Sequence, residues 1–182
     1  MTKLLLSLHV LAAILAVGPV AIAASMFPPA ARRTLADGSG GETLRTLHRI
    51  CRVYAALGIA VPVLGLATAS SLGVLGDPWL LTAIGLTAVA AGLLVFGVLP
   101  RQEALLAAAT SVGAASGGAA PGGAAPGGAA SGGATISGPP SDGAASGVRA
   151  TARLAMSTGL FNVLWAAVTV LMVWRPGSTT GA

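Results

Sequence analysis

Two histidines are the side chains of this sequence best suited to chemistry. His9 lies inside the first apolar run, about 7 Å from its start at Leu4 if each helical residue adds about 1.5 Å. Ionisable side chains are costly inside a membrane and often functional there. A neutral imidazole can ligate haem iron or copper. His9 is therefore a candidate ligand for haem b or copper, and the alternative is that it hydrogen-bonds to a neighbouring helix or reaches the interface.

Other possible ligands do not complete a metal site around His9. Met172 lies near the same predicted depth, and His with Met is a known haem or copper pair, although Met also serves as ordinary apolar filling. His48 lies at the opposite membrane boundary, where we expect it to face the interface. Cys51 is the only cysteine, which excludes a disulfide within the chain and CxxC chemistry. We expect it to be a small buried side chain, with palmitoylation as the alternative.

Prolines inside apolar runs create a packing problem. Pro19 and Pro62 each remove a backbone donor and free the carbonyl four residues earlier. Unsatisfied backbone groups in lipid cost several kcal/mol. Asn162 falls at a similar depth, so we expect its amide to donate to one of the two freed carbonyls.

Four apolar runs, long enough to cross lipid as helices, organise the chain. An all-α, four-helix transmembrane bundle is predicted, with spans at about 4–27, 50–70, 79–99 and 154–174. Pro28–Pro29 is expected to end the first helix, and Pro100–Arg101 the third. Residues 113–147 repeat Gly, Ala and Pro, gain little from burial, and are interpreted as a disordered loop.

Composition supports a membrane environment. Hydrophobic residues make up 54% of the chain and charged residues 8%, too few for a water-exposed surface. The net charge of +5 does not indicate nucleic-acid binding, because the arginines lie at the ends of apolar runs rather than along one face. Glycines at seven-residue spacing, Gly58 with Gly65 and Gly85 with Gly92, are typical of close helix packing and of a homo-oligomer.

The distribution of positive charge predicts an orientation in the plasma membrane. Loops that carry Lys and Arg stay cytoplasmic. Both termini are therefore expected outside and loops 28–49 and 100–153 inside, because most of the cations lie at those loops: Arg32, Arg33, Arg45, Arg49, Arg52, Arg101, Arg149 and Arg153. Arg45, Arg49 and Arg52 are also candidate contacts for anionic lipid headgroups. The alternative for the first run is a signal peptide cleaved after Ala21-Ile22-Ala23.

Several segments resemble a bacterial family of integral membrane proteins of unknown function. They are Leu8 to Pro19, Ser25 to Pro28, His48 to Ser70, Phe161 to Trp165 and Arg175 to Ser178. The resemblance implies four helices and no particular activity. That family is distantly similar to copper-resistance-type membrane proteins and to a haem-binding protoporphyrinogen oxidase group. Those proteins place a histidine early in the first helix, and here only His9 matches it.

Three functions remain open from the sequence. The first is a non-enzymatic four-helix membrane protein without an assignable activity. The second is a haem- or copper-handling protein that uses His9. The third is a small transporter subunit that works where Pro19 and Pro62 interrupt two helices. No carboxylate lies in the middle of a predicted span, which leaves a carboxylate proton relay without its residues.

Overall fold

The computed structural model describes residues 2–117 and 142–176, and every regular element in these two ranges is helical. The predicted all-α fold class is confirmed. The elements are α1 (Thr2–Asp37), α2 (Gly41–Leu57), α3 (Ala60–Leu72), α4 (Pro78–Gly92), the π-helical segment η1 (Leu93–Val98), α5 (Leu99–Gly117) and α6 (Asp142–Trp174).

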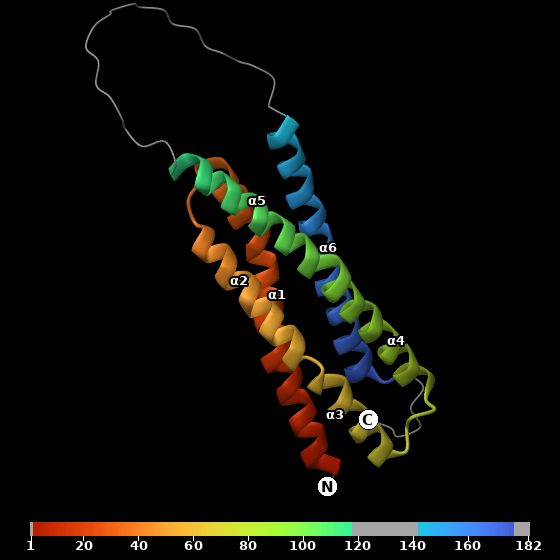
Figure 1. Cartoon of the computed structure of the whole chain (residues 1–182). Coiled ribbons are helices and arrows are strands. Elements are labelled where there is room, and N and C mark those ends of the chain that lie inside the picture. Colours follow the sequence, from red (N-terminus) through yellow and green to blue (C-terminus); the bar gives the residue numbers. More distant parts are fainter. Residues whose placement is uncertain (1, 118–141, 177–182) are drawn as a thin grey trace, which may run out of the picture.

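These elements form four long rods (Figure 1). α1 and α6 are one rod each, α2 and α3 follow one another in the second, and α4, η1 and α5 join into the third. Consecutive rods run in opposite directions. Four segments are long and apolar enough to cross a membrane, namely Thr2–Asp37, Gly41–Leu72, Pro78–Ala114 and Ser146–Trp174.

The core draws on all four rods and lies towards the end where α1 and α5 finish and α2 and α6 begin. Its largest fully buried apolar side chains are Phe27, Leu44, Leu154 and Val98. Many large apolar side chains instead cover the outside, and Phe96 is 82% exposed. An apolar exterior is stable only against an apolar solvent, which agrees with a multi-pass membrane protein.

Two helices extend beyond the ends predicted for them from the sequence. Pro28 and Pro29 lie inside α1, which runs on to Asp37, and Pro100 lies near the start of α5, which runs on to Gly117. The expected ends are therefore wrong. The reason is tertiary packing, because Ala31 and Thr34 beyond the first proline pair and Leu105 beyond Pro100 are all buried. Most of the predicted loop 113–147 lies outside the described residues, but its two ends, 113–117 and 142–147, are helical.

The chain adapts its backbone near Pro62 and near Pro100. Pro62 cannot donate to the Gly58 carbonyl, and the rod is interrupted there between α2 and α3. The Val61 N–H donates to that carbonyl instead, with an N···O distance of 3.1 Å. Upstream of Pro100, the helix widens into η1, where the Leu99 N–H bonds the Leu94 carbonyl five residues earlier. The π-helical segment therefore ends directly before the residue that precedes Pro100.

Candidate functional site

His9 lies in the contact between α1 and α3. Its side chain is only 8% exposed, and its Nδ1 lies 2.9 Å from the carbonyl oxygen of Val61. A carbonyl can only accept, so Nδ1 carries a proton in this contact. This contact ties α1 to α3 immediately next to the proline interruption.

Gly65 provides the space for the His9 ring. A Cβ atom placed on Gly65 would lie 2.9 Å from His9 Cε1, 3.3 Å from Nδ1 and 3.6 Å from Nε2. The edge of the imidazole that holds both nitrogens therefore lies against the α3 backbone. Close packing was expected at Gly65, and its partner is the His9 side chain. At Gly85 and Gly92, by contrast, a Cβ would meet nothing within 4 Å.

The predicted second ligand, Met172, is half-buried near the end of α6. The contacts that the structure gives His9 are instead with α3, through Val61 and Gly65. Across the residues that the structure describes, no three or more His, Cys, Asp or Glu side chains group closely enough to hold a metal ion. His9 is thus a lone imidazole in a helix contact.

A polar cluster joins α2 to α5. It consists of His48, Cys51, Gln102 and Glu103. His48 Nδ1 lies 3.1 Å from Gln102 Oε1, and Gln102 Nε2 donates to Cys51 Sγ at 3.5 Å. Gln102 is completely buried, and side chains of α2 provide hydrogen-bond partners for both its amide oxygen and its amide nitrogen. His48 Nε2 also lies 3.6 Å from Glu103 Oε1, close enough for an ion pair if the imidazole is protonated.

His48 was expected to face the interface, and that prediction is wrong because the side chain is 8% exposed. Cys51 is buried, as expected. Gln102 was not predicted from the sequence. A signal was present on α2, since Leu44, Leu47, His48 and Cys51 recur at spacings of three and four residues, which is the pattern of one buried face.

The candidate headgroup residues lie together. Arg45, Arg49 and Arg52 are all exposed, and their spacing of four and three residues places them on one face of α2, away from its buried face. Arg45 Nη1 also bonds Glu42 Oε1 at 2.7 Å on the same exposed surface.

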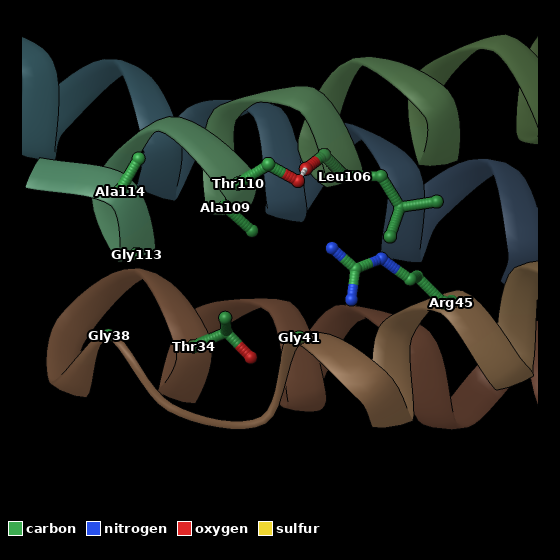
Figure 2. Close-up of a pocket in the computed structure, with 9 residues that line it drawn as sticks. All are labelled: Thr34, Gly38, Gly41, Arg45, Leu106, Ala109, Thr110, Gly113 and Ala114. Atoms are coloured by element: carbon green, nitrogen blue, oxygen red, sulfur yellow. Dashed lines mark hydrogen bonds between the residues drawn. The ribbon is translucent and has the colours of Figure 1, made fainter. Parts of the chain in front are cut away.

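A small open pocket of about 290 Å³ lies beside Arg45, between α5 on one side and α1 with α2 on the other (Figure 2). The Arg45 side chain reaches from α2 towards α5, and the hydroxyls of Thr34 and Thr110 line the pocket. Both hydroxyls donate to carbonyls of their own helices, those of Ala30 and Leu106. Their protons are therefore not offered to a ligand.

Asn162 does connect two helices, but its partner differs from the expected one. Its Nδ2 donates to Ser25 Oγ on α1 at 3.1 Å. The expected acceptor near Pro62 was the Gly58 carbonyl, and Val61 already serves it. The prediction of a freed carbonyl as partner is therefore wrong, because local backbone repair was available at Pro62.

Comparison of the chain with protein-family models, with curated proteins and with solved structures finds no match.

The His9–Gly65 contact gives a direct stability test. We expect Gly65→Ala to lower the free energy of unfolding of the detergent-solubilised protein by about 1–3 kcal/mol, the usual range for overpacking, and so to lower its melting temperature. Gly85→Ala, where a Cβ meets nothing within 4 Å, is the matched control and should leave the melting temperature nearly unchanged. Adding His9→Ala to Gly65→Ala should cost less than the two single losses combined. Strictly additive losses would contradict the contact.

Proposed function

We propose that this chain is a non-enzymatic multi-pass protein of the plasma membrane, with both termini outside and loops 28–49 and 100–153 in the cytoplasm. The charge distribution supports this orientation. One end of the bundle carries arginines on α1, α2, α5 and α6, whereas Lys3 and Arg175 lie towards the other end. At that other end, the Arg175 guanidinium lies 5.8 Å from the Trp79 ring centre, an arrangement typical of an interfacial belt.

We further propose that the protein binds anionic phospholipid headgroups along α2. This proposal is based on the placement of Arg45, Arg49 and Arg52, which share one exposed face of α2. Leu44, Leu47 and Cys51 are buried on another face of the same helix. Guanidinium groups bind phosphate through paired hydrogen bonds. Basic residues beside a membrane span are each worth about 1 kcal/mol towards an anionic surface.

Headgroup binding is tested by comparing two pairs of arginines. The Arg49→Gln/Arg52→Gln variant should weaken the binding of anionic phospholipid to the detergent-solubilised protein roughly 30-fold, from about 2 kcal/mol. The measurement is lipid retention by native mass spectrometry at graded lipid concentration and fixed salt.

The control removes the same charge elsewhere at that end. Arg33→Gln/Arg153→Gln also deletes two exposed cations, and it should weaken retention clearly less than Arg49→Gln/Arg52→Gln, because the two deleted arginines lie on different helices and not on one helix face. Equal losses of lipid retention in the two variants would show that lipid is attracted by the positive charge of this end in general, and not bound by the α2 face. Unchanged retention in the first variant would overturn the proposal.

Haem or copper binding through His9 is the second candidate. One observation favours it, because a hydrogen bond from Nδ1–H to a backbone carbonyl is the arrangement that orients many ligating histidines. The surroundings of His9 nevertheless do not fit the group. The nitrogen-bearing edge of the ring lies against Gly65, and the described residues contain no group of three or more His, Cys, Asp and Glu side chains that could hold a metal ion. No contact among the described residues favours a small transporter subunit either, and Pro19 lies inside the continuous helix α1 and does not interrupt it.

An absorption spectrum separates these candidates. Protein produced with haem supplied and purified in detergent should show no Soret band that depends on His9. His48→Ala is the matched control, because it removes a buried histidine from a different helix contact. A band that disappears in His9→Ala but persists in His48→Ala would establish the second candidate and contradict the packing role of His9.

A further inference from the structure

Thr158 differs from the other buried or half-buried threonines in the membrane-spanning part of the chain. The hydroxyls of Thr68 and Thr87 donate to carbonyls four residues earlier, at 2.7 and 2.8 Å. Thr158 lies on α6 and is 3% exposed, yet its Oγ1 has no hydrogen-bond partner among the residues that the structure describes. An unpaired buried hydroxyl costs about 1–3 kcal/mol, so its position calls for a partner.

Asn162 presents a second buried atom of the same kind. Its Nδ2 donates to Ser25 Oγ, but its Oδ1 is buried and unpaired within the described residues. Thr158 lies four residues before Asn162, which places the two side chains on one face of α6, about 6 Å apart along the axis. A hydroxyl and an amide oxygen therefore approach α1 together.

Helix α1 supplies a third group at this level. The Asn162–Ser25 bond shows that these two residues lie at the same height in the bundle. Because α1 and α6 run in opposite directions, Thr158, one turn before Asn162 on α6, lies at the height of Pro28 and Pro29, about one turn after Ser25 on α1 (Figure 1). Pro28 has no N–H to donate to the Ala24 carbonyl. Ala24 is completely buried, so this carbonyl is shielded from solvent. Helical carbonyls point towards the helix C-terminus, which here is towards the level of Thr158.

We propose that the seam between α1 and α6 binds one internal water molecule. The water accepts a hydrogen bond from the Thr158 hydroxyl and donates to Asn162 Oδ1 and to the Ala24 carbonyl. The three groups need a molecule with one acceptor and two donors, and buried waters typically make about three hydrogen bonds. This site is independent of headgroup binding, and it gives the Ala24 carbonyl the hydrogen bond that Pro28 cannot donate.

The test is water-edited solid-state NMR on the full chain in lipid bilayers, which measures magnetisation transfer from water to assigned side chains. Transfer to Thr158 and Asn162 should be several-fold faster than transfer to Thr68. Thr68 is the control because it is equally buried, at 5% exposed, and its hydroxyl bonds its own helix.

Two substitutions locate the water. Thr158→Val keeps the side-chain shape but removes the hydroxyl, and it should slow transfer to Asn162 to the rate of Thr68. Thr158→Ser keeps the hydroxyl and should preserve fast transfer, which guards against a folding defect in the valine variant. Transfer to Thr158 as slow as to Thr68 in the unaltered protein would overturn the proposal. That result would indicate a direct Thr158–Asn162 bond or a partner from a second copy.

Discussion

Lipid offers no hydrogen bonds, so the backbone of this protein must satisfy its own polar groups, and prolines are where that requirement is hardest to meet. Each proline in a helix removes one donor and crowds one carbonyl. The chain responds differently at different prolines. It interrupts the rod near Pro62, widens the helix before Pro100, and keeps α1 continuous through Pro28 and Pro29. The contacts between rods gather around these positions.

The side chains nearest the prolines act as connectors between helices. His9 bonds the carbonyl of Val61, directly before Pro62, and the bare backbone of Gly65 makes room for its ring. Asn162 bonds Ser25, one turn before Pro29. Apolar surface gains little by leaving lipid for protein, so close packing and polar bonds such as these decide which helices pair in a membrane. This is the physical reason to regard His9 first as a packing residue.

Sequence reasoning reached the fold because apolar length is a strong signal in membrane proteins. It failed at Pro28–Pro29 and Pro100, where proline alone was taken to end a helix, whereas buried residues such as Ala31 and Leu105 hold the helix together beyond it. It also failed for His48 and missed Gln102. A glutamine at a span boundary carries no pattern of its own, and only the fold shows that Gln102 faces α2. The partner of Asn162 was likewise set by the register of α1 against α6.

The arginine-bearing end and the proline-bearing interior thus have separate roles in our account. The exposed face of α2 with Arg45, Arg49 and Arg52 is proposed to meet lipid headgroups, and the interior contacts keep that face in place. Both roles require the membrane to cover the apolar exterior of the four rods.

The most direct test of this arrangement is labelling of single cysteines in intact cells with a membrane-impermeant maleimide, in a Cys51→Ser background. Leu75→Cys lies in the turn between α3 and α4, and Thr46→Cys lies on an exposed part of α2. We expect position 75 to be labelled in intact cells and position 46 only after the membrane is permeabilised. Labelling of position 46 in intact cells, with position 75 protected, would contradict it.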